Sequence, residues 1–150
     1  MLTIPHLTAT AAALLLTVST VSAATPQEEA NRKLVLEFYE RVLNQKDADA
    51  ATQYIGSSYR QHNPLVPDGV AALQGYVRGL KERSPQSKSV VKRSFAEGDH
   101  VILHVHATRS PEDRGVAIVD IFRLENGKVV EHWDVIQPVP EKSANGNTMF

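Results

Sequence analysis

The 150 residues are enough for one domain, and a hydrophobic fraction of 42% with a charged fraction of 22% is typical of a globular protein. The 17 acidic and 16 basic residues form no long run of either sign, so nothing indicates a nucleic-acid or membrane-surface partner. Because cysteine is absent, disulfides, thiolate catalysis and cysteine-ligated zinc are excluded.

The first 24 residues differ in composition from the rest of the chain. They contain no Asp, Glu, Lys or Arg, and the apolar stretch 9–21 is too short to span a bilayer. Val21 and Ala23 stand at the −3 and −1 positions of a signal-peptidase site. We therefore predict a signal peptide over residues 1–23 and a secreted or periplasmic mature protein without a membrane segment. A leader that is retained is the alternative.

A helix is predicted at the start of the mature chain. Thr25 and Glu28 match a capping box, and Pro26 stands at the first helical position. Apolar residues then recur at helical spacing to about Asn44. We expect one face of this helix to pack in the core.

Two further helices are expected. Asp47 can cap a short helix over residues 48–55, which Gly56 would end, and residues 70–83 carry a third apolar stripe. Between them, the segment YRQHNP is predicted to be a loop or a short extended piece, because Pro64 disfavours helical conformation in the residue before it.

The YRQHNP segment contains two candidate substrate-binding residues, His62 and Asn63. Polar residues on a loop that a rigid scaffold carries are often functional. The alternative, which the sequence favours equally, is that both side chains only satisfy backbone groups of a turn.

The periodicity changes from helical to alternating at about residue 86. Strands are expected over residues 87–96 and 100–109, followed by a hairpin over residues 115–136 whose arms meet at Asn126-Gly127. Helices followed by antiparallel strands predict the α+β class. The expected domain covers residues 24–140, with residues 141–150 as a flexible tail.

Polar side chains gather on one face of the closing hairpin. Residues two apart share a face of a strand, so His132 and Asp134 point the same way and Trp133 points the opposite way. On the first arm, Asp120 interrupts an apolar run. A carboxylate in such a run indicates a pocket, which Asp120, His132 and Asp134 would share as candidate catalytic residues.

The strand over residues 100–109 could add two histidines to this pocket. His104 and His106 share a face, and they line the pocket only if that face is also the face of Asp120. Otherwise they are half-exposed strand residues. Ile118 and Phe122 share the parity of Asp120 and are expected to contact a substrate.

The order of elements and three segments resemble the SnoaL-like polyketide cyclase group of the nuclear transport factor 2 superfamily. The segments are YRQHNP, GDHVILHVH and above all RGVAIVDIFRLENGKVVEHWDVIQPVP, and the resemblance covers about residues 28–140. It implies a cone-shaped α+β barrel in which three helices pack on a strongly bent antiparallel sheet around a deep pocket. It also implies a homodimer through the sheet and a general acid/base role for Asp134. Asp120 stands where the cyclases have a pocket histidine.

The expected function is therefore cofactor-independent acid/base catalysis on a small apolar carbonyl compound, by an aldol-type cyclase, an isomerase or a hydrolase-like enzyme. Asp134 would be the base and His132 its orienting partner. Asp120, with His104 or His106, would be the acid or the oxyanion donor.

Two other classes of function are open at this point. The same fold could be a non-catalytic binding module for a small ligand. Alternatively, His104 and His106, with His132 and a carboxylate, have the ligand types for zinc or iron. Because the resembling family uses no metal, we expect neither a metal nor a cofactor.

Overall fold

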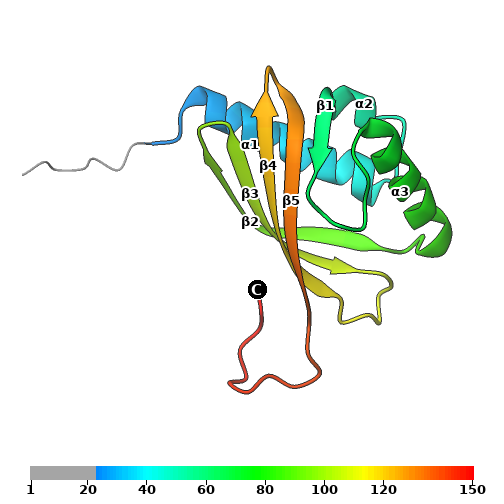
Figure 1. Ribbon diagram of the computed structural model, residues 1–150. Helices are drawn as coiled ribbons and strands as arrows, with labels where there is room; N and C mark the ends of the chain where they lie inside the picture. The colour runs from blue at the N-terminus through cyan, green and yellow to red at the C-terminus, as the bar shows by residue number, and fades with distance from the viewer. Residues whose placement is uncertain (1–22) are drawn as a thin grey trace, which may run out of the picture.

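The computed structural model describes residues 23–150, and the predicted signal peptide therefore lies almost wholly outside the described residues. The elements in chain order are α1 (Pro26–Phe38), the π-helix η1 (Tyr39–Asn44), α2 (Ala51–Tyr54), β1 (Ile55–Gln61), α3 (Val70–Arg83), β2 (Lys88–Glu97), β3 (His100–Thr108), β4 (Val116–Glu125) and β5 (Lys128–Pro138). The predicted α+β class is confirmed (Figure 1). Within residues 23–150, no helix has the length and apolar character needed to cross a membrane.

The first helix begins and ends where the sequence predicts. The Thr25 side chain accepts a hydrogen bond from the Glu28 backbone N–H, and the Glu28 carboxylate accepts one from the Thr25 N–H at 2.7 Å. The last part of the helix, η1, is wound as a π-helix and starts at Tyr39. Short π segments are rare and often occur at functional sites, and the Tyr39 side chain does reach into the site described below.

The second helix is shorter than predicted. It spans only Ala51–Tyr54, and Ile55 already begins β1, which pairs with β5 in parallel. Gly56 does not end the helix but lies in β1, where a Cβ atom would be 2.9 Å from Cγ1 of Val130. The prediction was wrong because the apolar, β-branched Ile55 gains more from pairing and burial beside β5 than from one further helical turn.

The five strands form one curved sheet in the order β1-β5-β4-β3-β2. All neighbours are antiparallel except β1 and β5, and the sheet is unclosed because β1 and β2 are its edges. The predicted hairpin between β4 and β5 is confirmed, since Asn126 and Gly127 both have positive φ, at 51° and 69°. Figure 1 shows α1 crossing behind the twisted strands and α3 beside β1.

The core forms where the inward side chains of the sheet meet α1 and η1. Val101, Leu103 and Val105 of β3 are fully buried and belong to one cluster with Phe38 and Val42. The alternate residues of β3 lie on the opposite, outer face of the sheet. This parity decides which polar residues of the strands can reach a cavity on the helix side.

Candidate functional site

A cavity of about 940 Å³ lies beside the core, lined by side chains of the helices and of the inner face of the sheet. Its walls are mainly apolar, and Ile118 and Phe122 are among the lining residues, where the sequence placed them. A concave, mostly apolar cavity with a few polar groups is the usual form of a small-molecule site.

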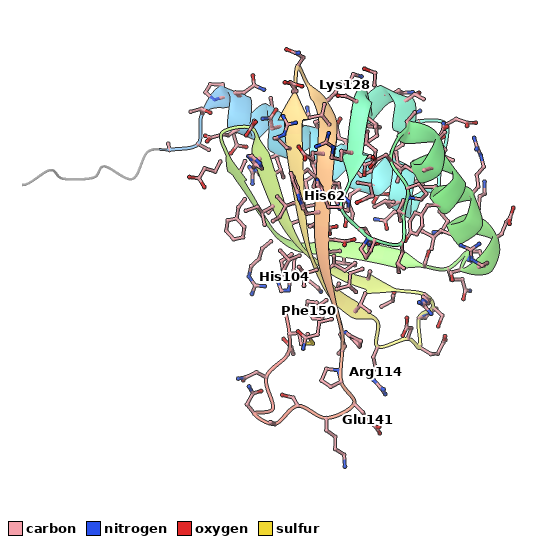
Figure 2. The ribbon with its side chains drawn as sticks, in the orientation of Figure 1. His62, His104, Arg114, Lys128, Glu141 and Phe150 are labelled. Atoms are coloured by element: carbon pink, nitrogen blue, oxygen red, sulfur yellow. The ribbon has the colours of Figure 1, made fainter. Side chains whose placement is uncertain are left out.

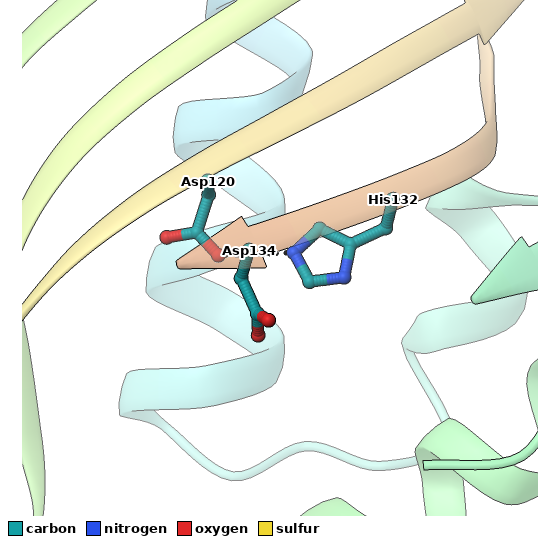
Figure 3. A group of neighbouring side chains, drawn as sticks. All are labelled: Asp120, His132 and Asp134. Carbon is teal, nitrogen blue, oxygen red and sulfur yellow. Dashed lines mark hydrogen bonds and ion pairs between the residues drawn. The ribbon is translucent and has the colours of Figure 1, made fainter. Parts of the chain in front are cut away.

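Asp120, His132 and Asp134 meet in this cavity (Figure 3). The register of β4 and β5 brings them together, because Asp120 pairs with Asp134 and Phe122 pairs with His132. One nitrogen or oxygen atom from each of the three lies within 4.8 Å of the other two. Asp120 and His132 are only 4% and 9% exposed, whereas Asp134 is partly exposed.

Asp120 is held on both of its oxygens. The Tyr39 hydroxyl donates to Oδ2 at 2.5 Å, and Nε2 of His132 lies 2.9 Å from Oδ1. The pKa of the Tyr39 phenol is raised well above its usual value by burial and by the adjacent Asp120 carboxylate. Tyr39 therefore stays protonated at neutral pH and acts as a permanent donor to Asp120.

Gln61 determines which nitrogen of His132 carries a proton. Oε1 of Gln61 accepts the backbone N–H of Asn63 at 2.9 Å, which fixes the orientation of the amide, and Nε2 of Gln61 donates to the Tyr59 hydroxyl. Nδ1 of His132 lies 2.8 Å from the same Oε1, an atom that can only accept. Nδ1 is therefore protonated, and one further proton is shared between Nε2 of His132 and Oδ1 of Asp120.

Asp134 is bound more loosely than Asp120. Nδ2 of Asn63 donates to Oδ2 of Asp134 at 2.7 Å, and Oδ1 of Asn63 accepts the Leu65 N–H, so the Asn63 amide is also oriented. Within residues 23–150, Oδ1 of Asp134 has no hydrogen-bond partner. Asp134 thus supplies a free carboxylate oxygen in the cavity.

Two further phenols line the cavity, Tyr59 and Tyr76. The pKa of each is raised, mainly by burial and also by the negative charges of Asp120 and Asp134. At neutral pH both phenols are neutral and can donate hydrogen bonds to a ligand.

His62 does not lie in the cavity, contrary to the expected role in substrate binding. Its ring stacks on Trp133, with centroids 4.6 Å apart and planes at 4°, and its Nε2 lies 2.9 Å from the Glu131 carboxylate. Trp133 is likewise absent from the cavity wall, as its parity predicts. Only Asn63 of the two expected loop residues reaches the cavity.

His104 and His106 are also outside the cavity, so the condition under which they would bind a substrate is not met and they are strand residues of the outer face. The inward positions of β3 are taken by Leu103 and Val105, whose burial favours this orientation of the strand. His104 lies 3.0 Å from a guanidinium nitrogen of Arg93, and Nε2 of His106 lies 2.8 Å from the Arg114 carbonyl oxygen.

The outer-face histidines contact the end of the chain instead. The Phe150 ring lies beside the His104 ring (Figure 2), with centroids 5.5 Å apart. The centroids of the Phe150 and His106 rings are 4.3 Å apart. A metal site built from these two histidines with His132 is excluded, because His132 lies on the inner face. Within residues 23–150, the group of His and carboxylate side chains close enough to share a metal ion is Asp120, His132 and Asp134.

Sequence reasoning missed Tyr39, Tyr59, Gln61 and Tyr76. The helical spacing places Tyr39 among the apolar residues of the first helix, and its hydroxyl gives no separate signal. Gln61 lies in a segment that the sequence predicts as a loop or a short extended piece, without deciding between them. In a strand, Tyr59 and Gln61 share one face, and Arg60 and His62 share the other, so alternation could have found the inward pair.

The comparisons with known proteins agree with this architecture. A family model described as a SnoaL-like domain matches residues 35–132. No curated protein matches the chain. A candidate SnoaL-like polyketide cyclase from Jannaschia sp. CCS1 has a similar solved structure, with a TM-score of 0.65 and 21% identity over 77% of this chain and 90% of that chain.

Two other solved structures are similar to this chain. A candidate isomerase of the SnoaL-like family from Agrobacterium tumefaciens has a TM-score of 0.62 and 13% identity over 73% of this chain and 98% of that chain. An NTF2-like protein of unknown function from Cytophaga hutchinsonii has a TM-score of 0.60 and 22% identity over 79% of this chain and 96% of that chain. At these identities the likeness shows the NTF2-like fold alone.

Proposed function

The chain belongs to the SnoaL-like family, and we propose that its cavity performs cofactor-independent acid/base catalysis on a small apolar molecule that contains a carbonyl group. The observation that carries the proposal is the unequal binding of two neighbouring carboxylates. Asp120 is held by Tyr39 and His132, whereas Asp134 keeps one oxygen free. One carboxylate is thus arranged to hold a proton with His132, and the other to accept one.

In the proposed reaction, Asp134 removes a proton from the carbon next to the substrate carbonyl. The C–H bond breaks, its electron pair forms the enolate double bond, and negative charge moves to the carbonyl oxygen. The proton shared by His132 and Asp120 is the source of a proton or hydrogen bond for that oxygen. Apolar walls exclude water and strengthen these interactions.

The enolate can then react in two ways. Return of the proton from Asp134 to a different carbon is an isomerisation. In an aldol closure, the enolate carbon forms a bond to a second carbonyl carbon, the C=O π pair of that carbonyl becomes an alkoxide, and the alkoxide takes the proton from Asp134. Two of the structural neighbours are described as a candidate isomerase and a candidate polyketide cyclase. Both reaction types begin with the proton abstraction proposed for Asp134.

Deuterium exchange tests this proposal. The protein is incubated in D₂O with aryl ketones, and loss of the proton signal at the carbon next to the carbonyl is followed by NMR. We expect exchange above the buffer rate in the wild type and only the buffer rate in Asp134→Asn. Binding of the ketones without any exchange would instead support the second candidate function, a non-catalytic binding module. The apolar walls of the cavity would be sufficient for such binding.

We also propose that the mature protein begins at Ala24 and is exported, on the strength of the uncharged apolar leader and the small residues before Ala24. N-terminal sequencing of the protein from its native host should give Ala24 as the first residue. A cytoplasmic protein that retains Met1 would contradict the proposal.

A homodimer through the outer face of the sheet is proposed as well. Three of the five strands, β5, β4 and β2, expose large apolar side chains there, with Val135 72%, Val119 42% and Phe95 58% exposed. Light scattering should give the mass of a dimer for the wild type and that of a monomer for Val135→Lys. A wild-type monomer at micromolar concentration would contradict it.

A further inference from the structure

The two ends of the cavity carry opposite charges. Asp120 and Asp134 lie at one end. The other end is formed by the last residue of α3, the first residue of β2 and the loop after β3, and it is lined by Arg83, Lys88 and Arg109. Leu103 of β3 pairs with Asp120. Arg109 comes about six residues after Leu103, which corresponds to roughly 20 Å of extended chain between the level of Asp120 and Arg109.

The three cations are not neutralised by neighbours. Within residues 23–150, none of the Arg83, Lys88 and Arg109 side chains forms an ion pair or a hydrogen bond. Asp113 lines the same end, but its carboxylate is held by the backbone N–H groups of Arg109 and Gly115. The excess positive charge here is local, because the whole chain has a formal net charge of −1.

Glu40 and Asp113 are two acidic groups within electrostatic range of these cations. Lys88 lowers the pKa of Glu40, and Arg109 lowers that of Asp113, although backbone or side-chain hydrogen bonds are the larger causes in both. At this end of the cavity, three positive charges therefore face the carboxylate of Asp113. This end attracts an anion.

Gly79 allows Arg83 to lie where it does. A Cβ atom at Gly79 would be 2.7 Å from both terminal guanidinium nitrogens of Arg83, so the guanidinium lies directly against the helix surface that glycine leaves open. The glycine lowers the intrinsic stability of α3, and the three atoms nearest to such a Cβ all belong to the Arg83 head group. By contrast, Gly75 in the same helix has no atom within 4 Å of such a Cβ.

Tyr76 lies within electrostatic range of both ends of the cavity. The negative charges of Asp134 and Asp120 raise the pKa of its phenol, after burial, and Arg109 and Arg83 oppose that shift. Tyr76, the cationic group and the carboxylate pair all line the same cavity, so a single elongated molecule can contact both ends.

From this arrangement we propose that the substrate is an amphipathic anion, an apolar carbonyl compound with a carboxylate at the end remote from the reacting carbon. Arg83, Lys88 and Arg109 bind the carboxylate, the apolar walls bind the body, and the carbonyl lies at Asp134. The inference rests on the proposed function for the placement of the carbonyl, and the charge preference follows from the cavity itself. Clustered cations at a cavity also concentrate anionic ligands from solution.

Equilibrium binding tests the charge preference without requiring turnover. The probes are 12-oxo-12-phenyldodecanoate and its methyl ester, which share the aryl ketone, differ in the terminal charge and have a chain long enough to reach from one end of the cavity toward the other. By calorimetry at low ionic strength we expect the acid to bind about tenfold more tightly than the ester, with an advantage that shrinks as salt is added. The advantage should vanish in the triple variant Arg83→Gln/Lys88→Gln/Arg109→Gln and persist in Arg78→Gln, whose side chain on the same helix pairs with Asp49 outside the cavity.

A glycine pair gives a second test that does not remove a charge. Gly79→Ala should displace the Arg83 head group and reduce the preference for the acid severalfold, whereas Gly75→Ala should leave the preference unchanged. Equal binding of acid and ester by the wild type would overturn the inference, and so would a preference that survives the triple variant.

The outcomes also separate this inference from the proposed function. Asp134→Asn should keep the preference for the acid while losing deuterium exchange, because the charge-binding group is distant from Asp134. Exchange without a charge preference would refute only the anionic substrate. A charge preference without exchange in the wild type would refute only the catalytic role of the cavity.

Discussion

The Tyr39 hydroxyl donates a 2.5 Å hydrogen bond to Oδ2 of Asp120, joining residues that are 81 positions apart in the chain. The bond connects the π-helical end of the first helix to the centre of β4. It also occupies the Asp120 oxygen that His132 does not contact. The first helix therefore helps to fix the carboxylate that shares a proton with His132.

Replacing Tyr39 with Phe should destabilise the protein. The substitution leaves Oδ2 of a buried carboxylate without a partner, which costs about 1–3 kcal/mol of the free energy of unfolding. Tyr54→Phe is the matched control, since Tyr54 also packs against Phe38 but its hydroxyl forms no hydrogen bond within the described chain. Urea unfolding measures both, and a loss below about 0.5 kcal/mol for Tyr39→Phe would contradict the structural role of the bond.

Alkaline pH should destabilise the protein through the same tyrosine. The pKa of Tyr39 lies well above its usual value of 10.0 in the folded protein, because of burial and the adjacent Asp120 carboxylate. Above about pH 10 the unfolded chain loses a proton that the folded protein keeps, so the free energy of unfolding falls as the pH rises. The contribution is complete below pH 10 and is lost as the pH approaches the folded-state pKa.

The expected slope for one such tyrosine is about 1.4 kcal/mol per pH unit. Urea unfolding of the wild type and Tyr39→Phe between pH 9 and 11.5 measures it. The two curves should run parallel below pH 10 and converge above it, because the variant lacks this titration. Curves that stay parallel up to pH 11.5 would show that the phenol titrates normally in the folded protein.

Two adjacent residues, His62 and Asn63, should respond differently to truncation. Asn63→Ala removes the donor that orients Asp134, and we expect the rate of deuterium exchange to fall by about one to two orders of magnitude, as is common for groups that orient a reactive residue. His62→Ala should leave the rate unchanged, because the ring stacks on Trp133 outside the cavity. NMR exchange rates per folded molecule test this pair. An equal loss of exchange rate in His62→Ala and Asn63→Ala would show that His62 also belongs to the site and that the cavity has been assigned wrongly.

Most of the fold could be predicted from local patterns. The capping box at Thr25 and the Asn126-Gly127 turn involve neighbouring residues, so composition and spacing suffice to locate them. The pairing of β1 with β5 could not be found in this way. It depends on the contact between Ile55 and Val129, 74 positions along the chain, and the local signal around Ile55 favours helix.

The part of the candidate site that lies on a single hairpin could be predicted from the sequence. Asp120, His132 and Asp134 meet because a short turn fixes the register of β4 and β5. The orientation of His104 and His106 depends instead on which set of β3 side chains faces the helices, and both sets contain apolar residues. Tyr39 and Gln61 reach the site from elements whose placement is set by tertiary packing, so parity within the hairpin could not reveal them.

The most direct test of the catalytic account is the deuterium-exchange rate of Asp134→Asn. Asparagine can still accept the hydrogen bond from Asn63 but cannot accept a proton, and it removes one of two neighbouring carboxylates. We predict a rate at least about 100-fold below that of the wild type, with a melting temperature no lower, and an unchanged rate in the exposed control Asp49→Asn. A less stable Asp134→Asn that exchanges as fast per folded molecule would contradict the account, because Asp134 would then be only a structural hydrogen-bond acceptor.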